Sequence, residues 1–229
     1  MEFLQAADFW IGLVKIVWIN IILSGDNAVV IALAARSLPP EQQRKAVFWG
    51  SGAAVVLRVL LTVVAAKLLA LSFLQVVGGC LLLWIGFQLL SDSDEDEGES
   101  KTYGSLMAAV RTILMADLVM SLDNVIAVAA AAQGSTTLLV LGLAISIPLV
   151  VFGSTMMIKL MERFPVIVVL GAALIGWVAG ETIAGDTALQ GLVAAHPSLH
   201  YVAAALGAIL VVGGGKLWQR RASRAAAST

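Results

Sequence analysis

A polar motif, Asn20-Ile21-Ile22-Leu23-Ser24-Gly25-Asp26-Asn27, lies inside a long apolar segment near the N-terminus. A second motif with the same polar positions, Asp117-Leu118-Val119-Met120-Ser121-Leu122-Asp123-Asn124, lies inside a later apolar segment. The aspartates of the two Asp-Asn pairs are 97 positions apart (123 minus 26). An ionised carboxylate at the centre of a bilayer costs about 2.5 kcal/mol or more. Two such carboxylates in matching surroundings therefore indicate a substrate or ion site inside a bundle of membrane helices.

The composition is that of an integral membrane protein embedded in a lipid bilayer. Of the 229 residues, 60% are hydrophobic and 13% are charged, and the mean hydropathy is +0.96. A soluble domain has about 25% charged residues. The net charge of -1 says little about partners, and we expect no nucleic-acid partner. The single cysteine, Cys80, excludes an intramolecular disulfide and a cysteine-based zinc site.

Seven segments of the chain are long and apolar enough to cross a membrane. A spanning helix needs about 20 predominantly apolar residues, and we expect an all-α membrane protein with seven transmembrane helices. The expected spans are 9–35, 46–69, 71–90, 105–132, 137–158, 166–183 and 201–217.

The distribution of lysine and arginine predicts the orientation, because cytoplasmic loops carry an excess of both. The loop after the first span, the loop after the fifth span and the C-terminal tail hold most loop cations and fall on one side of the membrane. These cations are Arg36, Arg44, Lys45, Lys159, Arg163, Lys216, Arg220, Arg221 and Arg224. We therefore expect a multi-pass protein of the bacterial inner (cytoplasmic) membrane, with the N-terminus outside and the C-terminus in the cytoplasm.

The two motifs belong to a longer internal repeat. Each copy contains three spans, and because three is an odd number the second copy enters the membrane from the opposite side. The sequence thus predicts two inverted three-helix repeats plus a seventh helix, with the site where the copies meet near the midplane. Further matches are Gly78 and Trp84 with Gly171 and Trp177, and Lys67 with Lys159. The expected parts are a first repeat at 1–91, an acidic cytoplasmic linker at 92–104, a second repeat at 105–186, and an outer loop, seventh helix and basic tail at 187–229.

The first motif predicts an interrupted helix. On a regular helix Asn20, Ser24 and Asn27 share one face, and Asp26 points away from it. Gly25 weakens the helix, and the span of about 27 residues is roughly 40 Å long, more than a hydrocarbon core of about 30 Å. A break near Ser24 would turn Asp26 inward. In the second copy Leu122 replaces Gly25, so a break there is predicted less strongly.

Carboxylates, side-chain amides and hydroxyls together make an all-oxygen site that suits Mg²⁺, Ca²⁺ or Mn²⁺. A carboxylate binds either a metal ion or a proton, and this competition is the physical basis of cation/proton antiport. We expect no organic cofactor, and no Gly-x4-Gly-Lys-Ser/Thr motif indicates ATP use. The candidate metal ligands are Asp26, Asn27, Asp123, Asn124, Asn20, Asp117, Ser24 and Ser121.

Two further charged residues within the predicted spans are candidate site residues. Arg58 is near the middle of the second span, where an arginine pairs with a carboxylate or faces water. It is either a tethered substitute for the metal ion or, as we favour, a fixed structural partner for one aspartate. Glu181, near the outer end of the sixth span, either lines an exit path or is exposed at the interface.

The segments Asn20–Ala32 and Asp117–Ala129 closely resemble the TerC family, which is grouped with the LysE-type exporters. The resemblance covers nearly the whole chain and includes the seven spans and both Ser-x-Asp-Asn motifs. It implies export of Mn²⁺ from the cytoplasm by a protein that is not an enzyme. It also implies metal-site roles for Asp26, Asn27, Asp123 and Asn124, with Asn20, Asp117, Ser24 and Ser121 matched by position.

Other functions remain open from the residues alone. An intramembrane aspartyl protease needs two carboxylates close enough to share a proton, but each aspartate here precedes an asparagine within a repeat. A membrane scaffold that helps to metallate secreted proteins would use the same site without transport. Alternative cargoes are Ca²⁺, another divalent cation or a small organic cation. The glycines of Gly50-Ser51-Gly52 suit close helix contacts within one subunit or between the subunits of a homo-oligomer.

Overall fold

A computed structural model describes residues 7–23, 25–68, 71–91, 105–132 and 134–226, and all regular structure in these residues is α-helical. The expected all-α class is confirmed for this part of the chain. The predicted acidic linker lies almost entirely outside the described residues. The helices are α1 (Ala7–Leu23), α2 (Gly25–Ala35), α3 (Pro40–Leu68), α4 (Leu74–Ser91), α5 (Leu106–Ala132), α6 (Thr136–Arg163), α7 (Val166–Gly185), α8 (Gln190–Ala195) and α9 (Ser198–Ala226).

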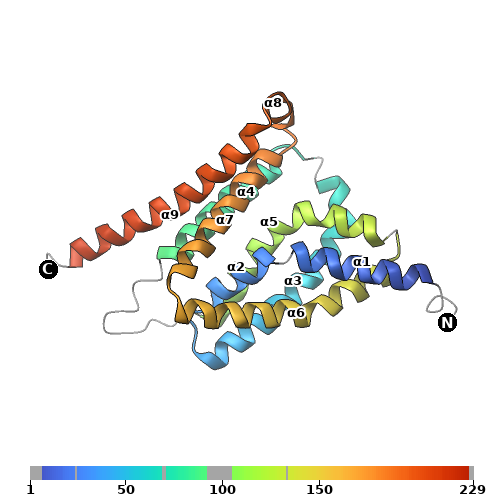
Figure 1. Cartoon of the computed structure of the whole chain (residues 1–229), viewed down its shortest axis with the longest axis horizontal. Coiled ribbons are helices and arrows are strands. Elements are labelled where there is room, and N and C mark those ends of the chain that lie inside the picture. The colour runs from blue at the N-terminus through green and yellow to red at the C-terminus, as the bar shows by residue number, and fades with distance from the viewer. Residues whose placement is uncertain (1–6, 24, 69–70, 92–104, 133, 227–229) are drawn as a thin grey trace.

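The helices form two groups that meet at an angle (Figure 1). Helices α4, α7 and α9 pack side by side in one group, and α1, α3, α5 and α6 pack together in the other. Helix α2 lies at the junction, where it contacts α3, α5 and α6 of one group and α7 of the other. The junction therefore brings both halves of the sequence together around α2.

Five helices are by themselves long and apolar enough to cross a membrane, either whole or in part. Helix α5 gives a sixth span if its two parts are taken together, because its direction changes by 67° between Leu106–Leu122 and Asn124–Ala132. The apolar parts of α1 and α2 are each too short to cross alone. The five are Pro40–Thr62, Leu74–Ser91, Thr136–Arg163, Val166–Gly185 and Ser198–Trp218.

Helix α5 bends close to the second Asp-Asn pair. Its change of direction falls between Leu122 and Asn124, although Leu122 stands where the first motif has a glycine. At the first motif, the structure describes α1 up to Leu23 and α2 from Gly25. Ser24 lies outside the described residues, so the predicted break near it stays a prediction.

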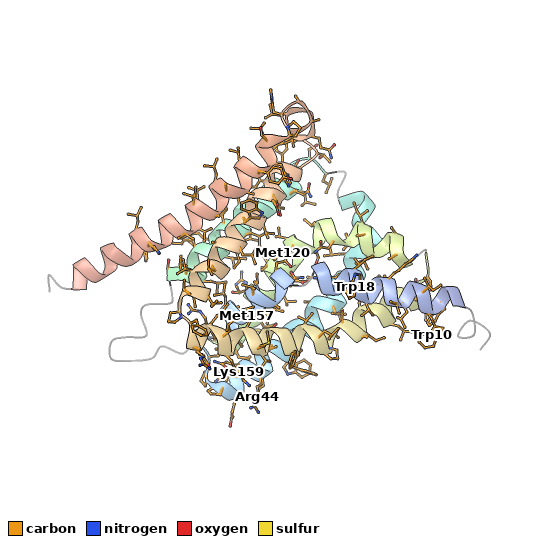
Figure 2. All side chains as sticks on the ribbon, in the orientation of Figure 1. Trp10, Trp18, Arg44, Met120, Met157 and Lys159 are labelled. Atoms are coloured by element: carbon orange, nitrogen blue, oxygen red, sulfur yellow. The ribbon has the colours of Figure 1, made fainter. Side chains whose placement is uncertain are left out.

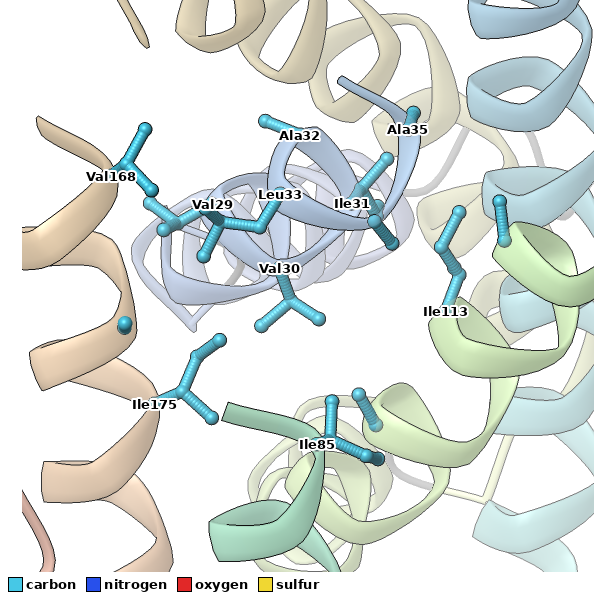
Figure 3. Packing of buried hydrophobic residues seen from close by; sticks show 14 of the residues in the cluster. Val29, Val30, Ile31, Ala32, Leu33, Ala35, Ile85, Ile113, Val168 and Ile175 are labelled. Atoms are coloured by element: carbon cyan, nitrogen blue, oxygen red, sulfur yellow. The ribbon is translucent and has the colours of Figure 1, made fainter. Parts of the chain in front are cut away.

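Helix α2 is buried on all sides. Its residues from Asn27 to Ala35 are all buried, which is typical of a helix enclosed by other helices. Figure 3 shows its side chains between Ile113 of α5, Ile85 of α4 and Ile175 of α7. This packing fixes the position of the Asp26-Asn27 pair at the start of α2.

Two glycines allow close contacts between helices that carry the motifs and their neighbours. A Cβ atom on Gly50 of α3 would lie 2.8 Å from Cδ1 of Ile113 of α5. A Cβ atom on Gly142 of α6 would likewise collide with the side chain of Ile16 of α1. Hydrogen in place of a side chain at these two positions therefore lets α3 approach α5 and α6 approach α1.

The outer surface is apolar, as expected for a protein surrounded by lipid. Only 28% of the apolar part of α6 and 22% of that of α9 is buried inside the protein. Figure 2 shows how side chains cover the outside of the bundle, with Arg44 and Lys159 at the same corner. The exposed large aromatic residues include Trp10, Trp18, Trp49, Trp84, Phe152 and Trp218.

Candidate cation site

Arg58 of α3 is buried in a polar cluster with two residues of α5. Its Nη2 donates to Oδ1 of Asp117 at 2.6 Å, and its Nε donates to Oγ of Ser121 at 3.0 Å. The Ser121 hydroxyl in turn donates to Oδ2 of Asp117 at 3.1 Å. The exposed fractions are 4% for Arg58, 6% for Asp117 and 0% for Ser121. Both oxygens of the Asp117 carboxylate are thus engaged within the cluster.

The expectation that Arg58 pairs with a carboxylate is confirmed, and its partner is Asp117. Asp117 and Ser121 are one turn apart on α5, so the shared face predicted for the second motif places both against Arg58. An unpaired charge inside a membrane protein is expensive. The pair allows both charged residues to remain within the bundle.

A small cavity lies beside this cluster, between α2, α3, α5 and α6. The space open to the centre of a water-sized sphere is about 20 Å³, which is enough for one water molecule or a bare cation. Ser51 contributes a buried Oγ atom that has no hydrogen-bond partner among the described residues. The polar residues of the cavity wall are Asn27, Ser51, Arg58, Asp117 and Ser146, and the apolar ones include Ile31, Ala54, Val55 and Val150.

The first motif reaches the same place through the start of α2. Asn27 is buried and lines the cavity. Asp26 is half-buried, and one of its oxygens accepts a hydrogen bond from the backbone N–H of Asn27 at 2.8 Å. Asp26 also lies close enough to Arg58 and Asp117 to interact electrostatically with both. The two motifs therefore meet at this cavity through Asn27 and Asp117. Asp26 precedes Asn27, and Ser121 hydrogen-bonds to Asp117.

Other predicted ligands are not placed at the cavity. The side chains of Asn20 and Asp123 lie outside what the structure describes, as does Ser24. Asn124 is half-buried but is not part of the cavity wall. Among the described residues, no group of three or more His, Cys, Asp and Glu side chains is placed to hold a metal ion. The described site consists of two carboxylates, an amide, several hydroxyls and one guanidinium.

Comparison with known proteins identifies the family. The family model described as "Integral membrane protein TerC family" matches residues 5–224. The chain belongs to the TerC family. No solved structure matches this TerC-family chain.

Several curated relatives are membrane proteins without an assigned activity. The chain is 44% identical over 189 residues to "Uncharacterized membrane protein YjbE" of Bacillus subtilis, covering 82% of this chain and 86% of the relative. It is 28% identical to "Uncharacterized membrane protein YkoY" of the same organism, covering 74% and 58%. It is 29% identical to "UPF0053 inner membrane protein YoaE" of Escherichia coli, covering 74% and 36%. These relatives support the assignment of this chain as an integral membrane protein.

Ser51 and Ser146 belong to the site although the sequence did not single them out as ligands. Each is a small hydroxyl residue within an apolar span, and Ser51 stands between two glycines. That pattern is a weak signal, because serine is common in membrane helices, where it hydrogen-bonds to the backbone. Ser146 does so as well, donating to the carbonyl oxygen of Leu143 at 2.6 Å.

Glu181 is not part of the candidate site. It lies on α7, and its Oε1 is 3.7 Å from Nε2 of His200 on α9. Both side chains are more than one-third exposed. The structure thus places Glu181 at a partly open contact between α7 and α9, and its suggested role in an exit path stays a prediction.

Asp186, directly after the end of α7, is a buried carboxylate that the sequence did not single out. Its exposed fraction is 0%, and its carboxylate accepts backbone hydrogen bonds from Phe73, Gln75 and Val76 at the start of α4 and from Ala188. Burial acts to raise the pKa of this carboxyl, but the four N–H donors outweigh it and hold the pKa below its usual range. Asp186 therefore caps α4 and ties it to the end of α7.

Proposed function

We propose that this protein is a membrane transporter that exports divalent metal cations, with Mn²⁺ as the principal cargo, in exchange for protons. The observation that carries the proposal is the placement of Asn27 from the first motif and Asp117 from the second motif in the wall of one small cavity inside a bundle of membrane helices. Buried ionisable residues in such bundles mark ion and substrate pathways. A scaffold would use the same site without transport, so measured export separates these two functions.

The chemistry of the cavity suits a hard divalent cation. Carboxylate, amide and hydroxyl oxygens come from Asp117, Asn27 and Ser51, and oxygen ligands are preferred by Mn²⁺, Mg²⁺ and Ca²⁺. The choice of Mn²⁺ among these rests on the resemblance to the TerC family. A carboxylate that binds either a proton or a metal ion provides the exchange step.

The proposal includes an inverted repeat with seven spans. In it, α1 and α2 form one interrupted span, which with α3 and α4 makes the first repeat. Helices α5, α6 and α7 make the second repeat, and α9 is the seventh span. The pattern of contacts supports this arrangement. If the repeats are exchanged, α6 takes the place of α3, and the span formed by α1 and α2 takes the place of α5. The contact of α3 with α5 then corresponds to the contact of α6 with α1. The same exchange converts the contact of α4 with α5 into that of α7 with α2.

The glycine contacts support the same exchange at single positions. Gly50 and Gly142 are 92 positions apart (142 minus 50), as are Lys67 and Lys159. Ile16 and Ile113 are 97 positions apart (113 minus 16), as are Asp26 and Asp123. The packing of Gly50 on Ile113 therefore corresponds to the packing of Gly142 on Ile16.

The proposed orientation has the N-terminus outside and the C-terminus in the cytoplasm of a bacterial inner membrane. Arg44 at the start of α3 and Lys159 near the end of α6 lie at the same corner of the molecule (Figure 2). The excess of Lys and Arg in cytoplasmic loops assigns that corner to the cytoplasm.

The decisive experiment measures ⁵⁴Mn accumulation in cells that express the protein at matched membrane levels. We expect the parent protein to lower cellular Mn and Asp26→Asn to abolish the effect, because the variant removes a carboxylate of the site without changing its size. Glu162→Gln, at an exposed carboxylate on α6, is the matched control and is expected to export like the parent. Full export by Asp26→Asn, or no export by the parent, would refute the proposal and favour the scaffold or protease.

A further inference from the structure

The charged pair of Arg58 and Asp117, which joins the two repeats, has no charged counterpart at the equivalent positions. Thr62 donates to the carbonyl oxygen of Arg58 at 2.7 Å, and Ser154 donates to that of Val150 at 2.7 Å. The two donors are 92 positions apart (154 minus 62), and so are the two acceptors (150 minus 58). This is the separation of Gly50 and Gly142, and it places Val150 at the position equivalent to Arg58.

The residue equivalent to Asp117 is also uncharged. Asn20 precedes Asp117 by 97 positions, the same separation as that of the two Asp-Asn pairs. The contact of α1 with α6 therefore has Asn20 and Val150 at the positions where the contact of α5 with α3 has Asp117 and Arg58. Both charges are present in one of these two equivalent contacts and both are absent from the other, as expected for side chains that act as a pair. Helices α1 and α6 contact each other without a charged pair at these positions, so a contact of this kind does not require one.

The location of Arg58 and Asp117 in the cavity wall indicates how their pairing affects cation binding. Arg58 and Asp117 line the same cavity, and Oδ1 and Oδ2 of Asp117 are occupied by Arg58 and Ser121. As long as the guanidinium stays in place, Arg58 neutralises the charge of Asp117, so the carboxylate attracts a metal ion in the cavity only weakly. Asp26 is a second carboxylate that interacts with Arg58 and is available to receive it.

We propose that Arg58 is a tethered cation that neutralises Asp117 while the site is empty and that an arriving divalent cation must displace it. This inference rests on the proposed function and identifies Arg58 as the residue that determines which cations the site accepts. Arginine stays protonated under all physiological conditions, so the empty site never holds Asp117 as an uncompensated buried charge. A divalent cation attracts the carboxylates twice as strongly as a monovalent cation at the same distance. Displacement of Arg58 therefore favours divalent cargo over Na⁺ or K⁺.

The test measures Mn²⁺ binding to the purified full-length protein in lipid nanodiscs by isothermal titration calorimetry. Arg58→Gln removes the competing charge but retains hydrogen-bond donors for Asp117 and Ser121. We expect its Kd for Mn²⁺ to fall at least about tenfold, and we expect K⁺ to compete with Mn²⁺ in the variant but not in the parent. A purely structural role for Arg58 predicts the opposite sign, because loss of a structural partner weakens the site.

Arg58→Lys keeps the positive charge, so it still provides a test if Arg58→Gln does not fold. A lysine ammonium lacks the planar fork that contacts Asp117 and Ser121 together, so it is displaced more easily. We expect its affinity for Mn²⁺ to lie between those of the parent and Arg58→Gln. Arg44→Gln, at an exposed position on the same helix, is the matched control and is expected to bind like the parent.

The outcomes separate this inference from the proposed function. If the parent binds Mn²⁺ and neither Arg58 variant binds it more tightly, the tethered-cation role is refuted and the export proposal stands. If the parent protein binds no divalent cation, both the tethered-cation role and the export proposal are refuted. Tighter binding in the order parent, Arg58→Lys, Arg58→Gln supports the inference.

Discussion

Nη2 of Arg58 lies 2.6 Å from Oδ1 of Asp117, although 59 positions separate the two residues in the chain. The contact joins α3 to α5 within the part of the bundle that we assign to the membrane. It also forms one wall of the cavity to which the first motif contributes Asn27. The same two side chains thus stabilise the packing of two helices and set the charge of the candidate site.

Breaking this pair on one side is expected to destabilise the protein strongly. Removal of one partner of a buried ion pair leaves the other charge uncompensated and costs about 3–5 kcal/mol. We expect Arg58→Val and Asp117→Asn each to lower the midpoint of thermal unfolding in detergent. The double variant, which recreates the neutral combination of Val150 and Asn20, is expected to recover most of the loss.

The double-variant cycle distinguishes pairing from independent effects. If the losses of Arg58→Val and Asp117→Asn simply add in the double variant, the two side chains do not act as a pair. Arg44→Gln serves as a control for the loss of a positive charge on α3, because Arg44 is exposed.

Contact between α7 and α9 is expected to depend on the absence of a side chain at Gly176. A Cβ atom there would lie 2.8 Å from Cα of Ala208 and equally close to the carbonyl carbon of Gly207, so backbone rather than a flexible side chain blocks it. We expect Gly176→Ala to cost about 1–3 kcal/mol, measured as a lower unfolding midpoint in detergent. Gly213→Ala on α9, where no atom lies within 4 Å of the added Cβ, should have no such effect, and equal losses in both variants would contradict this account.

Capping of α4 by Asp186 is expected to contribute to stability in a pH-dependent way. Asp186→Ala leaves the backbone N–H groups of Phe73, Gln75 and Val76 without their acceptor, and hydrogen bonds to a charged group contribute about 1.5–3 kcal/mol. Asp186→Asn retains one acceptor oxygen and is expected to lose less. Thr187→Ala, at the exposed neighbouring residue, is the control.

The sign of the pH dependence follows from the lowered pKa of Asp186. Its pKa in the folded protein lies below the ordinary value of 3.8, so the stabilisation is complete above that value. It is lost as the pH falls through the folded-state pKa. Unfolding midpoints of the parent and Asp186→Asn should therefore converge in acid, and a constant difference down to the lowest pH would refute the assignment.

Features that depend on one helix could be predicted from the sequence. Hydropathy alone indicates the helical membrane class, which the described residues confirm. Gly25 and the length of the first segment also predict an interruption near Ser24, which lies outside the described residues. The presence of a buried Arg58 also predicts a carboxylate partner, because an unpaired arginine in this setting is too costly.

Features that depend on the register between helices could not be predicted. The identity of the partner as Asp117 depends on how far α3 is shifted along α5, which no local pattern encodes. Asp186 caps a helix whose first residues are 111 positions away, while its own polar surroundings in the sequence are those of a solvated loop. The bend of α5 occurs without a glycine at position 122, so it depends on tertiary contacts.

The paired glycine contacts predict two closures that must alternate during transport. In the proposed orientation, Gly50 and Ile113 lie towards the cytoplasmic ends of α3 and α5, whereas Gly142 and Ile16 lie towards the outer ends of α6 and α1. Inverted repeats in transporters exchange their conformations to open the site to one side at a time. In a Cys80→Ser background, we expect a short thiol cross-linker between Gly50→Cys and Ile113→Cys to abolish ⁵⁴Mn export, and the Gly142→Cys and Ile16→Cys pair to do the same. Each cysteine alone, treated with the same reagent, is the control, and undiminished export by either cross-linked pair would show that its contact does not open.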